Sequence, residues 1–166
     1  MTKLHLAQVN VARMRTPLED PAMIDFVARL EEINALADRS PGFVWRLQTA
    51  EGNATYLRPY ADHLLLFNMS VWESVEHLKR YVYYSAHVQV LRRRAEWFER
   101  PGAVHMALWW LPAGDLPSVD EGKKRLAYLE ANGPTAFAFT FSKPFPPDPA
   151  VVETTDRSGF EPCPAS

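Results

Sequence analysis

The residues best suited to chemistry lie between residues 64 and 98. Residues 64–72 alternate as in a strand, which places Asn68, Ser70 and Trp72 on one face and only apolar side chains on the other. An amide, a hydroxyl and an indole on a largely apolar face suit a pocket in which a few polar groups orient an apolar ligand. The alternative is structural: Asn68 is satisfied by backbone hydrogen bonds and Trp72 covers the core.

The segment that follows carries side chains able to move protons. His77, Tyr81 and Tyr84 have the spacing of one helical face, and His87 lies about one turn further on, on an adjacent stripe. Histidine is the natural proton carrier near neutral pH, because its unperturbed pKa is about 6.5. We favour His87 over His77, which follows the strand by only one turn. The alternative is that His77 is exposed and His87 is a hydrogen-bonded residue at the edge of the core.

Further amides and indoles are expected near this stretch. Gln8 and Asn10 share one face of a predicted first strand, which the predicted topology places beside residues 64–72. Amides that meet in a cavity need a ligand or ordered water to satisfy them. Trp109 and Trp110 point to opposite faces of a later strand, so only one of them can line the pocket, and we assign Trp109.

A basic run stands out within the helical segment. Arg92, Arg93 and Arg94 fan over most of a helical turn and cannot form one binding face. Glu96 and Glu99 lie within reach of these arginines. We expect a solvated helix end or an interface, although one arginine could clamp a carboxylate.

The elements that must position these residues follow a recognisable order. Period-two alternation and helical spacing predict strands at 4–11, 43–49, 64–72, 103–112 and 136–141, and helices at 21–38, 74–99 and 118–131. The long helix is expected to kink near residues 84–85. This order, β-α-β-β-α-β with an extra α-β, predicts an α+β ferredoxin-like domain. We place the domain at residues 1–142 and a proline-rich arm or disordered tail at 143–166.

Composition excludes several classes of function. The 166 residues carry a formal net charge of −2, which argues against a nucleic-acid partner. No apolar run approaches the roughly 20 residues that span a membrane, and the N-terminus lacks a signal-peptide pattern. The single cysteine, Cys163, leaves no internal disulfide or cysteine-rich metal site. We therefore expect a cytoplasmic protein without a bound metal.

Five stretches together resemble a known family: INALADRSPGFVWRLQ, NMSVWES, YSAHVQVLRRRAEWF, LWWLPAG and AFTF. They are similar to an uncharacterised bacterial family (DUF3291-like) of the dimeric α/β-barrel superfamily, and distantly to antibiotic-biosynthesis monooxygenases. The resemblance covers roughly residues 3–145. It implies a homodimer whose sheets pack together as a barrel, with a pocket between each sheet and its own helices. Asn68 and Trp72 match a monooxygenase site pair in type and spacing, and Ser85-Ala86-His87 matches a superfamily motif.

The function that this resemblance favours is a cofactor-independent, monooxygenase-like enzyme for an aromatic or polyketide-like substrate. Asn68 and Gln8 would hold an enolate-like oxygen, His87 or a tyrosine would take a proton, and Trp45 and Trp72 would pack the ring. The predicted catalytic residues are His87, Asn68 and Tyr84, and the predicted substrate-binding residues are Gln8, Asn10, Trp45, Trp72, Tyr81 and Trp109.

Two other functions remain open from the sequence. The same pocket would serve a non-catalytic protein that binds a small ligand. An IsdG-like haem-degrading oxygenase uses an asparagine, a tryptophan and a histidine, which Asn10, Trp72 and His87 (or His77) offer in type. Their spacing does not match that family, so we expect no cofactor and keep haem as the third alternative.

Overall fold

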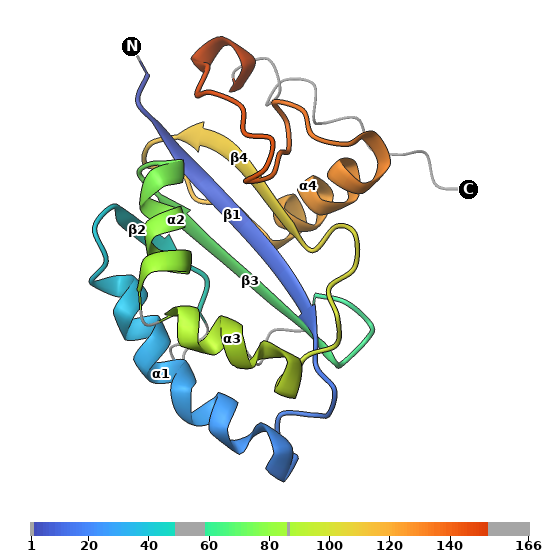
Figure 1. Cartoon of the computed structure of the whole chain (residues 1–166). Helices are drawn as coiled ribbons and strands as arrows, with labels where there is room; N and C mark the ends of the chain where they lie inside the picture. The colour runs from blue at the N-terminus through green and yellow to red at the C-terminus, as the bar shows by residue number, and fades with distance from the viewer. Residues whose placement is uncertain (1, 49–58, 86, 153–166) are drawn as a thin grey trace.

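The fold is a single antiparallel sheet with helices on both faces (Figure 1). The computed structural model describes residues 2–48, 59–85 and 87–152. The strands are β1 (Leu4–Arg13), β2 (Phe43–Arg46), β3 (Leu65–Trp72) and β4 (Met106–Pro112). The helices are the 3-10 turn η1 (Pro21–Met23), α1 (Ile24–Asp38), α2 (Val75–Tyr84), α3 (His87–Trp97) and α4 (Val119–Asn132).

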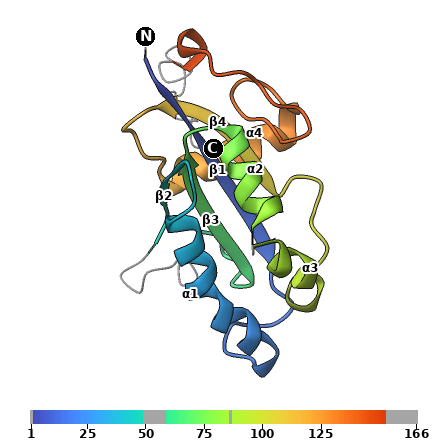
Figure 2. The same ribbon diagram turned by 60° about the vertical axis from the view of Figure 1, so that its left-hand side comes forward.

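The strand order β2-β3-β1-β4 confirms the ferredoxin-like prediction. β1 is central and pairs with β3 on one side and β4 on the other, both antiparallel. In Figures 1 and 2, α1, α2 and α3 lie on one face of the sheet and α4 lies on the other. We call these the pocket face and the α4 face.

The predicted long helix is two helices rather than one kinked helix. Ser85 has extended backbone angles, with φ −112° and ψ −178°, and this ends α2. Its hydroxyl donates to the carbonyl of Tyr81 and accepts from the backbone N–H of His87 at 3.1 Å. The hydroxyl therefore caps both helix ends at the break, which sets the direction in which α3 leaves.

The predicted fifth strand at 136–141 is wrong. This segment forms one isolated bridge, in which Leu108 and Phe139 exchange backbone hydrogen bonds of 2.9 and 2.8 Å. The Thr140 hydroxyl contacts the Ser142 hydroxyl at 3.0 Å, and the backbone carbonyl of Thr140 accepts a hydrogen bond from the N–H of Lys143. These local bonds turn the chain away from the edge of β4. The alternating aromatic residues of this segment therefore pack into the core, and the segment does not add a strand to the sheet.

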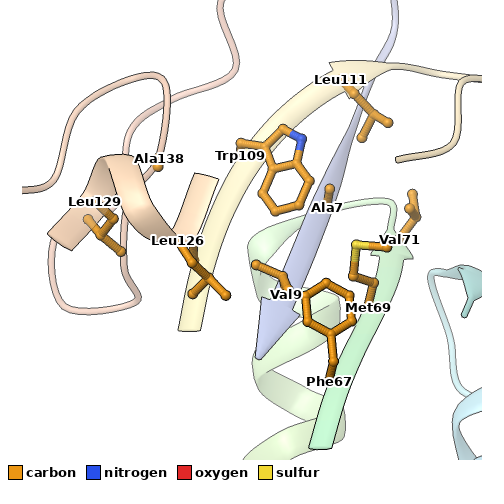
Figure 3. Close-up of a cluster of buried hydrophobic side chains, with 11 residues drawn as sticks. Ala7, Val9, Phe67, Met69, Val71, Trp109, Leu111, Leu126, Leu129 and Ala138 are labelled. Atoms are coloured by element: carbon orange, nitrogen blue, oxygen red, sulfur yellow. The ribbon is translucent and has the colours of Figure 1, made fainter. Parts of the chain in front are cut away.

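The α4 face is closed by side chains of the same chain (Figure 3). Val9, Met69 and Trp109 pack there against Leu126 of α4. A Cβ added to Gly122 of α4 would lie 2.7 Å from the Sδ of Met69, so only glycine allows this close approach of helix to sheet. This cluster is a core within one chain.

The chain beyond the predicted domain boundary also packs on the sheet. The indole N–H of Trp110 donates to the carbonyl of Phe145 at 2.9 Å, and the ring of Phe145 lies 5.9 Å from that of Phe139. The rest of the predicted tail, 153–166 with Cys163, lies outside the described residues, and the boundary itself stays a prediction. In the described part of the chain, no helix is long and apolar enough to cross a membrane.

Candidate functional site

A cavity of about 390 Å³ lies between the pocket face and the helices α1, α2 and α3. Its size is that of a small-molecule site. The wall is largely apolar and aromatic, with a few amide, imidazole and guanidinium groups. Six of the predicted site residues line it: Gln8, Asn10, Asn68, Trp72, Tyr81 and His87.

A chain of hydrogen bonds runs along the floor of the cavity. Gln8 pairs directly with Ser70 across β1 and β3, so their side chains meet on the pocket face. The Ser70 hydroxyl donates to Gln8 Oε1 and accepts from Trp72 Nε1, both at 2.9 Å. Gln8 Nε2 then donates to Asn10 Oδ1 at 2.9 Å. These bonds fix the orientation of each side chain in a partly desolvated floor.

The Asn68 side chain makes no hydrogen bond to other described residues and is exposed within the cavity mouth. It lies opposite Asn10 in the sheet. Its amide can therefore donate to a ligand oxygen, whereas the Gln8 amide is already committed to the floor network.

Stacked rings form the wall at the α2 end. The Trp72 indole stacks on the Tyr81 ring with centroids 5.1 Å apart and an angle of 28° between their planes. The His87 imidazole also contacts the Tyr81 ring, with centroids 4.9 Å apart and an angle of 44° between their planes. The Tyr81 hydroxyl donates to the carbonyl of Ile33 at 3.2 Å, and burial raises the pKa of this phenol far above its ordinary value. Tyr81 is thus a protonated packing residue and not a base.

His87 has the features of a neutral base. Its Nδ1 lies 3.3 Å from the carbonyl oxygen of Val82, which can only accept, so Nδ1 carries the proton and Nε2 keeps its lone pair. Burial lowers the pKa of His87 below its ordinary value, and the bond to Val82 offsets this only in part. Nε2 makes no hydrogen bond to the described residues, so it is able to accept a proton from a ligand.

Two arginines reach the same cavity. Arg46 is held by Asp38 at the end of α1, with N–O distances of 2.7 and 3.3 Å. Arg94 comes from α3, and its guanidinium lies 5.7 Å from the centre of the Phe98 ring. The predicted site set omits both arginines and Ser70. The position of Ser70 on the polar face of its strand is the signal that could have added it.

The family of the chain is decided by one comparison. A family model described as a domain of unknown function, DUF3291, matches residues 5–155. The chain belongs to the DUF3291 family. No curated protein matches it.

Several solved structures are similar to this DUF3291 protein. SnoaB, a cofactor-independent oxygenase from Streptomyces nogalater, is 16% identical with a TM-score of 0.45, over 69% of this chain and 98% of SnoaB. Rv0793 from Mycobacterium tuberculosis is 18% identical with a TM-score of 0.46, over 69% of this chain and 99% of its own. A dabb family protein with a ferredoxin-like fold from Mesorhizobium loti is 13% identical with a TM-score of 0.39, over 68% and 99%. These values are too low to assign an activity or a substrate.

Two predicted tryptophans lie on the other face of the DUF3291 sheet. Trp109 pairs with Ala7, is 0% exposed and belongs to the core beneath α4. Trp45 also packs against that core, because a register shift between Phe43 and Trp45 in β2 breaks the alternation. Phe43 consequently meets Trp72 on the pocket face while Trp45 does not.

Tyr84 lies outside the cavity, with 83% of its surface exposed. It is the last residue of α2, and the side chains of α2 that pack toward the sheet are those of Val75, Leu78, Tyr81 and Val82. His77 is likewise outside: its Nδ1 contacts the Ser74 hydroxyl at 2.7 Å in the first turn of α2. Of the two helix histidines, only His87 lines the cavity.

The described residues hold no group of three or more His, Cys, Asp or Glu side chains that could bind a metal ion. The polar groups of this DUF3291 cavity are amides, hydroxyls, imidazoles and guanidinium groups. Such groups hold oxygen atoms and move protons.

Proposed function

We propose that the cavity is the active site of a cofactor-independent, monooxygenase-like enzyme that acts on a small aromatic or polyketide-like molecule. The observation that carries the proposal is His87, a half-buried neutral imidazole whose Nε2 is available beside an apolar, aromatic wall. A base of this kind suits removal of a proton from a phenol or an activated C–H group.

Each residue of the cavity has a role in this scheme. His87 accepts the proton at Nε2, and Asn68 donates a hydrogen bond to the oxygen on which negative charge develops. Trp72 and Tyr81 pack against the ring, and the floor network of Gln8 holds Trp72 in place. The electron-rich anion then adds dioxygen at a ring carbon that carries a hydrogen, and the resulting hydroperoxide loses water to leave a carbonyl. One oxygen atom enters the product, the other leaves as water, and the substrate supplies all four electrons.

Oxygen uptake tests the proposal directly. Purified protein is mixed with a panel of two- and three-ring hydroxyarenes, and oxygen consumption is followed with an electrode. We expect at least one substrate to be turned over and His87→Gln to lower the rate about hundredfold or more. The matched control is His63→Gln, an exposed histidine outside the cavity, which should keep the full rate.

The pH dependence adds a second readout. The rate of oxygen uptake should rise as the pH increases through the pKa of His87, which burial places below its ordinary value of about 6.5. The His87→Gln variant should not show this rise. Tight binding of hydroxyarenes without any oxygen uptake would instead favour the non-catalytic binding protein. A Soret band on mixing with haem would favour the haem alternative.

The predicted homodimer is part of this proposal, but the structure limits how it can form. α4 covers the sheet face that a partner's sheet would need, and Val9, Met69 and Trp109 are fully buried there within one chain. A barrel formed sheet to sheet therefore requires α4 to leave its place. Native mass spectrometry of the wild type gives the number of subunits.

A further inference from the structure

The cavity contains a cation that no described residue of the protein neutralises. Arg94 is half-buried on α3 and lines the cavity beside Phe98. It makes no hydrogen bond or ion pair from its guanidinium to any described residue. Burial lowers the pKa of Arg94 from its ordinary value, yet arginine remains charged in proteins.

The neighbouring arginines behave differently. Arg93 binds Glu96 at 2.8 Å and Asp25 of α1 at 3.2 Å. One residue of a helix turns the side chain by about 100°, so Arg93 faces α1 while Arg94 faces the cavity. Arg46, the other arginine of the cavity, is held by Asp38. Of the two arginines in the described cavity wall, Arg94 is the one without a carboxylate partner.

A partly desolvated guanidinium gains most from an anion that it can bind with two parallel hydrogen bonds. A carboxylate fits one guanidinium in both charge and geometry. A phosphate carries a charge of about −1.5 to −2 and would need further donors. Arg94 lies beside the Phe98 ring, and Val90, one helical turn before it on α3, also lines the cavity, which favours a ring system bearing a single acidic group.

The position of Arg94 in the cavity also determines where the acidic group of the ligand would lie. His87 and Arg94 are seven residues apart on one helix, which corresponds to a rise of about 10 Å. Trp72 lies opposite Leu6 at the start of β1, and Phe98 bridges to Met14 just beyond its end. The cavity therefore runs along β1 from the aromatic wall to Arg94.

We propose that the ligand of this cavity is an aromatic carboxylate, whose ring lies against Trp72 and Tyr81 and whose carboxylate is bound by Arg94. The inference rests on the proposed function only in taking the cavity as the ligand site, and it holds with or without turnover. It makes Arg94 the residue that selects acidic over neutral aromatic molecules.

Two probes of the same shape test this selectivity. Binding of 2-naphthoate and of its neutral isostere 2-naphthamide is measured by fluorescence titration and calorimetry at low salt. We expect wild type to prefer the carboxylate by about tenfold to hundredfold, as for a hydrogen-bonded charge pair. Arg94→Gln should abolish the preference, Arg94→Lys should keep part of it, and Arg92→Gln, an exposed residue of the same helix, should keep all of it.

Further readouts separate this role from a structural one. Because Arg94 makes no ion pair within the described protein, Arg94→Gln should leave the melting temperature unchanged or raise it. Affinity for 2-naphthamide should not change. Equal binding of both probes to wild type, binding of neither at millimolar concentration, or a preference that survives Arg94→Gln would each overturn the inference. A preference for the carboxylate without oxygen uptake would overturn the proposed function alone.

Discussion

The hydroxyl of Ser70 is the small group on which the floor of the cavity depends. It accepts a hydrogen bond from Trp72 Nε1 and donates one to Gln8 Oε1, both at 2.9 Å. Trp72 is 1% exposed and Gln8 is 7% exposed, so bulk water does not reach them freely. Ser70→Ala removes both bonds with almost no change in volume, and it leaves a buried donor and a buried acceptor unsatisfied.

The expected loss follows from these two orphaned groups. An unsatisfied buried polar group costs about 1–3 kcal/mol. We assign about 2 kcal/mol to the nearly inaccessible Trp72 indole and about 1 kcal/mol to the Gln8 amide, which lies beside the cavity and can recruit water. Ser70→Ala should therefore lower the free energy of unfolding by about 3 kcal/mol. For a chain of this size the melting temperature should fall by about 6–12 °C.

A double-mutant cycle with Trp72→Phe isolates the mechanism. Urea unfolding, followed by circular dichroism, is measured for wild type, Ser70→Ala, Trp72→Phe and the double variant. Trp72→Phe removes the indole N–H that would otherwise be left without a partner. The loss of unfolding free energy in the double variant should therefore be smaller, by at least about 1 kcal/mol, than the sum of the losses in the two single variants. Ser142→Ala, which removes a surface hydroxyl, is the control. Additive losses, or a loss below about 0.5 kcal/mol for Ser70→Ala, would refute the reasoning.

Two further predictions concern other parts of the molecule. The folded-state pKa of His87 is lowered, so its contribution to stability is complete above about pH 7 and is lost as the pH falls from there toward that pKa. Urea unfolding at pH 7.5 and 5.5 should show this pH dependence reduced in His87→Gln and retained in His63→Gln. Gly122→Val should destabilise by about 2 kcal/mol, because the added atoms overlap the buried Sδ of Met69, and thermal unfolding measures the loss. A Cβ added to Gly102 meets nothing within 4 Å, so Gly102→Val should be nearly neutral.

The sequence alone determined the order of the four strands of the sheet and the two faces of β1, β3 and β4. Alternation in β1 and β3 assigned Gln8, Asn10, Asn68 and Trp72 to one face, and the structure has them lining one cavity. Side-chain direction has a period of two in any strand, whatever its partners are. Helical spacing likewise located α1 and α4. These are local properties of the chain, which is why they can be read without the fold.

Tertiary structure decided where that local periodicity fails. The register shift in β2 moves Trp45 to the α4 face, and the break at Ser85 replaces one long helix with two and leaves Tyr84 exposed on the last turn of α2. The sequence predicted a kink near residues 84–85 but not a complete break, and no spacing rule marked the bulge in β2, because that bulge depends on the strand paired beside it.

Partners were also beyond the reach of the sequence. Three adjacent arginines look alike in the sequence, yet Arg93 meets carboxylates of α1 and α3 while Arg94 faces the cavity. Ser70 gains its place from its pairing with Gln8 in the sheet, a contact between residues 62 positions apart. The sequence determined which chemical groups exist and on which faces they lie. Only the packing of distant segments determined which groups are satisfied and which remain available to a ligand.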